Sequence, residues 1–142
     1  MVESIELRAL KFCDENKLRL TEPRLEVLKI ISLSSKPIKA YEILDKLSEV
    51  INNPKPPTAY RAIEFWQKYN FVHRIESLNS YMICEADHLH KGSQYMICDG
   101  CGIVIETHLC KLPAALAKSI KKKTFIPSRW SLEINGMCGQ CI

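Results

Sequence analysis

Two pairs of cysteines share the spacing Cys-x-x-Cys and hold four of the seven cysteines in the chain. The pairs are Cys98 with Cys101 and Cys138 with Cys141. In this spacing a tight turn directs two thiolates at one metal ion, so two such pairs can complete a tetrahedral zinc site. The pattern predicts a closed structural zinc centre. Glycines stand in or beside both turns, where the backbone must fold back: Gly100, Gly102, Gly136 and Gly139.

Two disulfides, or a redox motif, are the alternative interpretations of these cysteines. The opening residues 1–6 have no apolar signal region, which argues against secretion and favours a cytoplasmic location, where thiols stay reduced. No apolar run approaches the roughly 20 residues of a membrane span. The net charge of +4 is too small to indicate a nucleic-acid partner by itself.

The pattern of elements changes near residue 84. Helical periodicity before residue 69 predicts four helices, and two short strands follow them. The last helices followed by a hairpin give the order of a winged helix-turn-helix domain. The expected helices are Glu3–Glu15, one capped by Thr21, one that follows Pro37 and ends at Asn52, and one opening after Thr58. The expected strands are Phe71–Ile75 and Ser80–Ile83.

The second half has an α/β pattern of about 58 residues, too few to bury a large core without a metal or another staple. We therefore expect an α+β protein with one domain at residues 1–83 and a second, zinc-containing domain at residues 84–142. The second domain is expected to contain strands at 94–97, 103–106 and 124–134, and a helix at 113–122.

The fourth helix is the best candidate for contacting DNA. At 100° per residue, Arg61 points away from the apolar face of this helix and lies near its start. Recognition helices place their first residues on base edges, and arginine suits the O6 and N7 acceptors of guanine. A solvated surface charge is the alternative for Arg61. The apolar face is expected to contain Ala59, Ala62, Ile63 and Trp66.

Several segments together resemble the ferric uptake regulator family, and the match covers nearly the whole chain. Within that family, Pro56–Thr58 and Phe71–Ser77 are most similar to the zinc-sensing branch. The segments that carry the resemblance are Arg19–Thr21, Ala40–Leu44, Pro57–Phe65, Phe71–Ile75 and Cys98–Gly102.

The resemblance implies a homodimeric repressor with an N-terminal winged helix and a C-terminal dimerisation domain. It implies binding to double-stranded, palindromic, A/T-rich operator DNA when a sensory site holds zinc, and control of zinc uptake genes. The four cysteines match the structural zinc site of the family. The implied DNA contacts are Tyr41, Thr58, Tyr60 and Arg61.

The resemblance also implies a second, regulatory zinc site, so that each chain holds two zinc ions. Two imidazoles, one thiolate and one carboxylate form a reasonable four-coordinate zinc site. Each residue also has a simpler interpretation, as a core histidine, a buried thiol or a charge at the end of a strand. The implied ligands are His73, Cys84, either His88 or His90, and Glu106.

Other functions remain open from the sequence. A family member could sense iron, manganese or peroxide instead of zinc. A zinc hydrolase or deaminase is a more distant alternative, but the chain lacks His-x-Glu, Pro-Cys-x-x-Cys and His-Glu-x-x-His, so we expect no enzyme and no small-molecule substrate. His108 and Cys110 are either a third metal site or a surface pair.

Overall fold

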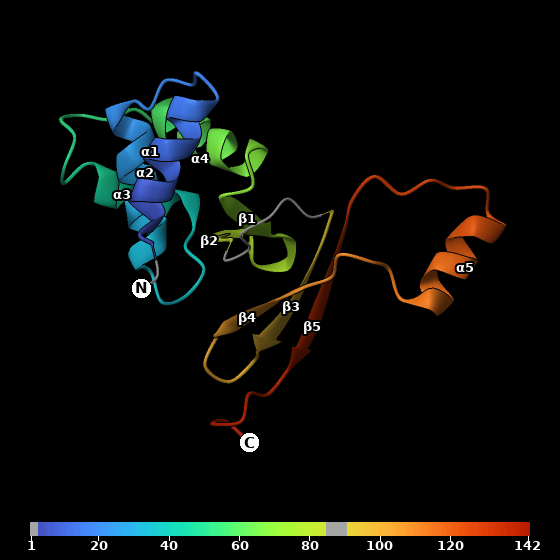
Figure 1. Ribbon diagram of the computed structural model, residues 1–142. Helices are drawn as coiled ribbons and strands as arrows, with labels where there is room; N and C mark the ends of the chain where they lie inside the picture. Colours follow the sequence, from blue (N-terminus) through green and yellow to red (C-terminus); the bar gives the residue numbers. More distant parts are fainter. Residues whose placement is uncertain (1–2, 85–90) are drawn as a thin grey trace. The chain divides into compact units, whose positions relative to one another are not determined.

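The computed structural model describes residues 3–84 and 91–142 and divides into the units Met1–Cys84 and Glu85–Ile142. Four helices and a hairpin form the first unit, and a three-stranded sheet and one helix belong to the second (Figure 1). The first unit contains α1 (Ile5–Glu15), α2 (Glu22–Leu33), α3 (Ala40–Leu47), α4 (Pro56–Lys68), β1 (Val72–Ile75), the 3-10 turn η1 (Glu76–Leu78) and β2 (Ser80–Ile83). The second contains β3 (Gly92–Cys98), β4 (Val104–His108), α5 (Ala114–Lys122) and β5 (Trp130–Gly136).

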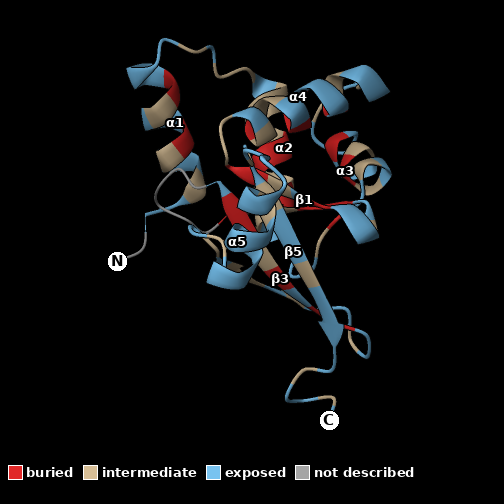
Figure 2. Ribbon diagram, turned by 90° about the vertical axis from the view of Figure 1, so that its right-hand side faces the viewer, coloured by how far each residue is buried: buried red, intermediate tan, exposed pale blue. Residues whose placement is uncertain are grey.

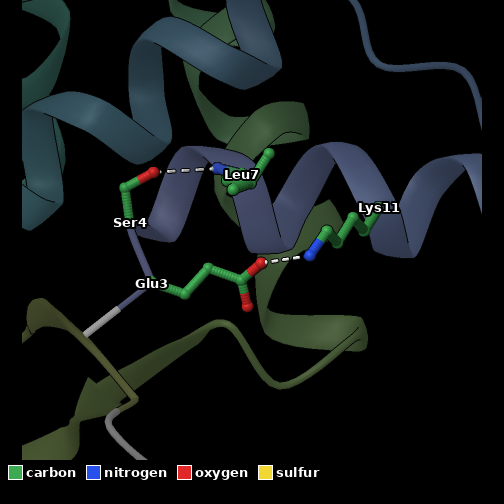
Figure 3. A network of polar contacts seen from close by, with 4 residues as sticks. All are labelled: Glu3, Ser4, Leu7 and Lys11. Carbon is green, nitrogen blue, oxygen red and sulfur yellow. Dashed lines mark hydrogen bonds and ion pairs between the residues drawn. The ribbon is translucent and has the colours of Figure 1, made fainter. Parts of the chain in front are cut away.

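Side-chain caps fix the starts of the first two helices. The Leu7 N–H donates to Ser4 Oγ at 3.2 Å, and Glu3 pairs with Lys11 at 2.6 Å on the exposed side of α1 (Figure 3). Such an exposed pair adds little stability, whereas a serine cap typically contributes about 1 kcal/mol. Thr21 caps α2 by accepting from the Arg24 N–H, which confirms its predicted role.

Two predicted helix boundaries are wrong. The fourth helix begins at Pro56, not after Thr58, because proline at the first helical positions has a suitable φ and needs no N–H partner there. The third helix ends at Leu47, five residues before Asn52, and Val50 is 55% exposed. The predicted apolar periodicity of that helix therefore runs past its last turn.

The core of the first unit is centred on Trp66, which is fully buried. Its indole Nε1 donates to the carbonyl of Arg24 in α2 at 2.7 Å, and its ring meets Phe71 edge-on at 5.0 Å. The whole predicted apolar face of α4 is buried, which leaves the opposite face of that helix free. Buried residues of α2 and α4 lie together in this core (Figure 2).

The hairpin that follows α4 is an antiparallel pair of strands with His73 opposite Met82. Ile38, just before α3, joins β2 by hydrogen bonds with Tyr81 at 2.9 and 2.8 Å. The hairpin is therefore hydrogen-bonded to the segment that leads into α3. This completes the winged helix-turn-helix arrangement expected from the element order.

In the second unit β3 lies between β4, which is antiparallel to it, and β5, which is parallel. The predicted last strand starts too early, because β5 begins only at Trp130. No residue of α5 is buried (Figure 2). The register aligns Ile105, Met96 and Ile134 across the sheet, and all three are exposed.

Within the described ranges 3–84 and 91–142, no helix is long and apolar enough to cross a membrane.

Replacing Trp66 with alanine tests how far the first unit depends on this core. Truncating a fully buried tryptophan should lower the free energy of unfolding by about 3 to 5 kcal/mol, and the Arg24 carbonyl loses its donor. Urea unfolding followed by the helical circular dichroism signal measures this, since α1 to α4 belong to the first unit. The control is Leu33→Ala at a residue 86% exposed, which should stay within about 0.5 kcal/mol of the parent. Equal stability of the two variants would contradict the proposed role of the core.

Candidate metal centres and DNA-binding surface

The four cysteines of the two Cys-x-x-Cys pairs come together in the second unit. Cys98 ends β3 and Cys101 follows in the next turn, while Cys138 and Cys141 follow β5. Their four Sγ atoms lie within 4.8 Å of one another, and those of Cys101 and Cys138 are 3.8 Å apart. Sulfurs bound to zinc at about 2.3 Å in a tetrahedron are separated by about 3.8 Å. The arrangement fits a four-thiolate zinc ion, and all four cysteines are free thiols, not disulfides.

Hydrogen bonds shift the pKa values of two thiols of this centre in opposite directions. The N–H groups of Cys101 and Cys138 donate to Cys98 Sγ at 3.5 and 3.3 Å, and these bonds lower the pKa of the Cys98 thiol to about 6. The pKa of Cys141 is raised to about 12, first by its hydrogen bond to the Cys138 sulfur. A doubly charged cation offsets the repulsion among four thiolates and allows Cys141 to ionise.

Glycine is required in the first turn and not in the second. A Cβ on Gly100 would lie 3.0 Å from Met137 Cε and 3.1 Å from both Cβ and Sγ of Cys141. Gly102 has a φ of 77°, which an L side chain rarely adopts. Gly136 and Gly139 have open space around the Cβ position, and neither has a positive φ. The expectation is confirmed for the first turn and wrong for the second.

The first unit places two of the expected regulatory ligands on one face of its hairpin. The N–H of Cys84 donates to the carbonyl of Phe71 at 2.9 Å, so the antiparallel pairing continues one residue beyond β2. Because alternate residues share a face, His73 and Cys84 are diagonal neighbours on the same side. His73 is half-buried and Cys84 is buried. A cysteine sulfur and an imidazole thus lie on one face of the hairpin.

The remaining expected ligands lie outside this hairpin. Glu106 is a half-buried residue of β4, opposite Tyr95 in the second unit. His88 and His90 fall outside the described residues, so the choice between them stays open. His108 and Cys110 are exposed, and they join no group of three or more potential metal ligands within the described part of the chain.

The expected DNA contacts are mostly accessible. Tyr41 in α3 is 61% exposed and Tyr60 in α4 is 49% exposed. Arg61 is also exposed, whereas Thr58 is half-buried in the first turn of α4. The first unit therefore presents one tyrosine from α3 and the Tyr60–Arg61 pair from α4 to a ligand.

One feature of the hairpin is missing from the sequence-based prediction. Arg74 donates through Nε and Nη2 to Asn79 Oδ1 at 3.2 and 2.8 Å, and its Nη1 lies 3.0 Å from Glu76 Oε2. Asn79 adopts the left-handed conformation at φ 46°, which asparagine tolerates better than most residues. Asn79, an asparagine between two predicted strands, was the sequence signal that could have predicted this turn. These exposed contacts span the turn between β1 and β2, the hairpin that forms the wing of the domain.

Residues 15–135 match the model of the ferric uptake regulator family. The chain belongs to this family. The match confirms the resemblance and, with the observed elements, the α+β fold with an N-terminal winged helix.

Within the family the chain is similar to regulators named for zinc. It is 38% identical over 136 residues to the zinc uptake regulation protein of Escherichia coli (strain K12), covering 95% of this chain and 80% of that protein. A structure of a zinc uptake regulator complexed with zinc and DNA is 38% identical with a TM-score of 0.89, covering 96% of this chain and 92% of the other. The crystal structure of holo XcZur is 36% identical with a TM-score of 0.83, covering 95% of each chain.

A matched pair of glycine variants tests the four-cysteine centre. Gly100→Ala should weaken zinc retention because its Cβ presses on Cys141, whereas Gly139→Ala should resemble the parent. Zinc release to a colorimetric chelator measures the difference, and the Gly100 variant should release zinc at least severalfold faster. Identical release from the two variants would show that the turn does not depend on this close approach.

Proposed function

We propose that this chain is a zinc-responsive transcriptional repressor that binds operator DNA as a homodimer and controls zinc uptake genes. The observation that carries the proposal is the four-sulfur centre and winged helix in a chain 38% identical to a zinc uptake regulation protein. It is a regulator and not an enzyme. Four thiolates close the coordination sphere of the first centre, which leaves no position for a catalytic water.

Each chain is proposed to hold two zinc ions, one structural and one regulatory. The structural ion is held by Cys98, Cys101, Cys138 and Cys141. The regulatory ion takes His73 and Cys84 from the wing, Glu106 from the second unit, and either His88 or His90. The shared face of His73 and Cys84 supports this set, and so does the suitability of its donor atoms for zinc.

Zinc at the regulatory site would act by restricting the motion of the two units of each chain relative to each other. Two winged helices of a dimer reach adjacent major grooves only at a spacing of about 34 to 36 Å or a multiple of it. A metal with ligands from both units favours one arrangement over the others. The coupling free energy between two such sites is typically about 1 to 3 kcal/mol. Because this coupling is reciprocal, operator DNA must tighten zinc binding by the factor by which zinc tightens operator binding.

The second unit supplies the proposed dimer contact. Its sheet exposes the aligned residues Ile105, Met96 and Ile134, and α5 has no buried residue. A second copy would remove this apolar surface from water, as obligate dimers do.

On DNA, α4 is the proposed recognition helix, and the proposed operator is palindromic and A/T-rich. Tyr60 and Arg61 contact bases from α4, with Thr58 in its first turn and Tyr41 contributing from α3. The buried opposite face of α4 supports this orientation, because only the outer face is free to enter a groove.

Cys84→Ser tests the regulatory site separately from the structural one. The variant should remain a folded dimer with its four-cysteine zinc and should lose the zinc dependence of operator binding. Fluorescence anisotropy at buffered free zinc concentrations measures this, with metal analysis after purification. Retained zinc dependence would remove Cys84 from the switch. Operator binding restored at lower free iron or manganese than zinc would instead indicate a sensor of those metals.

Arg61→Ala tests the recognition helix. If Arg61 makes a bidentate contact with guanine, its loss should weaken operator binding by about 1 to 3 kcal/mol and leave binding to unrelated DNA almost unchanged. An equal loss on both DNAs would mean a phosphate contact. No loss on either would exclude α4 as the element that reads the sequence.

A further inference from the structure

The free face of α4 carries an acidic side chain beside the expected guanine contact. Glu64 lies one helical turn after Arg61, and residues three apart are neighbours on a helix surface. Both side chains are exposed, and within the described residues neither forms a hydrogen bond or an ion pair. Each therefore remains available to a ligand, although their opposite charges could have paired.

The start of α4 is poorly suited to holding a phosphate. Helix N-termini bind anions through free backbone N–H groups, but Pro56 and Pro57 have none. The next N–H, that of Thr58, already donates to the Lys55 carbonyl at 3.0 Å. Contacts between α4 and DNA consequently depend on side chains more than on the backbone of the helix.

The cation of the neighbouring hairpin does not neutralise Glu64. Arg74 directs its guanidinium to Asn79 and Glu76. Burial raises the pKa of Tyr81, and the negative charges of Glu64 and Glu76 act in the same direction while Arg74 opposes them. Glu64 therefore lies near the wing as a carboxylate whose acceptor atoms are unoccupied within the described structure.

An unpaired carboxylate on a DNA-binding helix has two physical effects. It repels phosphates, which lowers the affinity for DNA of any sequence. It also accepts hydrogen bonds from exocyclic amino groups, which the major groove offers at cytosine N4 and adenine N6. At adenine the adjacent N7 is an acceptor and repels a carboxylate, so cytosine is the better partner.

We propose that Glu64 is a specificity-determining residue that accepts a hydrogen bond from N4 of a cytosine in each operator half-site. Three helical residues rise about 4.5 Å and one base step rises about 3.4 Å, so this cytosine lies one or two base pairs from the guanine contacted by Arg61. The inference rests on the proposed function, since it requires α4 to be the recognition helix.

The sharpest test is Glu64→Gln, measured with the zinc-loaded, full-length dimer at fixed salt. Each base pair of one operator half-site is replaced in turn, and dissociation constants are obtained by fluorescence anisotropy. The parent should lose on the order of tenfold in affinity when the cytosine is replaced. Glutamine can both accept and donate, and it pairs with adenine N6 and N7, so the variant should prefer adenine at that one position.

Glu15→Gln is the matched control, because Glu15 is an exposed acid at the end of α1 and undergoes the same change of charge. Both variants should bind unrelated DNA slightly more tightly than the parent, but only the Glu64 variant should change base preference. If Glu64→Gln keeps the parent's preference at every position, the inference is wrong. If Arg61→Ala still abolishes discrimination at its guanine, α4 remains the reader and only the role of Glu64 fails.

Discussion

The second unit depends on holding the ends of two parallel strands at one point. In the register of β3 and β5, Cys98 lies opposite Gly136, and the Asp99 N–H donates to the Gly136 carbonyl at 2.7 Å. Each strand then continues into a turn that carries further sulfur ligands. A structural zinc site can contribute on the order of 10 kcal/mol to folding, as much as the entire stability of many domains. Within one chain, the sheet of this unit exposes Met96, Ile105 and Ile134, and α5 has no buried residue, so a contribution of this size matters greatly here.

The first unit is stabilised differently, and this difference suits its task. Trp66 joins α4 to α2 through a buried hydrogen bond and packs against Phe71 at the start of the hairpin. The inner face of α4 is thus fixed by the core while its outer side chains remain free. A rigid helix with unpaired polar side chains can discriminate among bases, because misplaced partners cannot be accommodated by movement of the helix.

Much of this organisation could be predicted from the sequence, and the errors have physical causes. The Cys-x-x-Cys spacing predicted the four-sulfur centre because metal ligation restricts spacing strongly. Helical periodicity predicted the buried face of α4. Periodicity could not locate the end of α3, since Val50 continues the apolar pattern beyond the last turn. Proline was treated as preceding α4 although it is favourable within its first turn.

Features that depend on the conformation of a turn, or on contacts between distant segments, were the least predictable. The clamp of Arg74 by Asn79 and Glu76 depends on the conformation of a turn, and the hydrogen bonds between Ile38 and Tyr81 join segments about forty residues apart. The unequal need for glycine in the two sulfur-bearing turns depends on the approach of Met137 and Cys141 to Gly100. Apart from Asn79, the sequence contains no signal for these contacts.

The parallel pairing of β3 with β5 also sets an order of assembly during synthesis. The first unit is complete at Cys84 and can fold while later residues are still being added, since domains fold as units from the N-terminus. By contrast, β3 acquires its second neighbour only after β4, α5 and the segment up to Trp130 have emerged. During that interval Cys98 and Cys101 lack their partner thiols and are open to oxidation or to capture by other soft metals. The nascent chain is therefore exposed to the cell's zinc supply and redox state before it can regulate any gene.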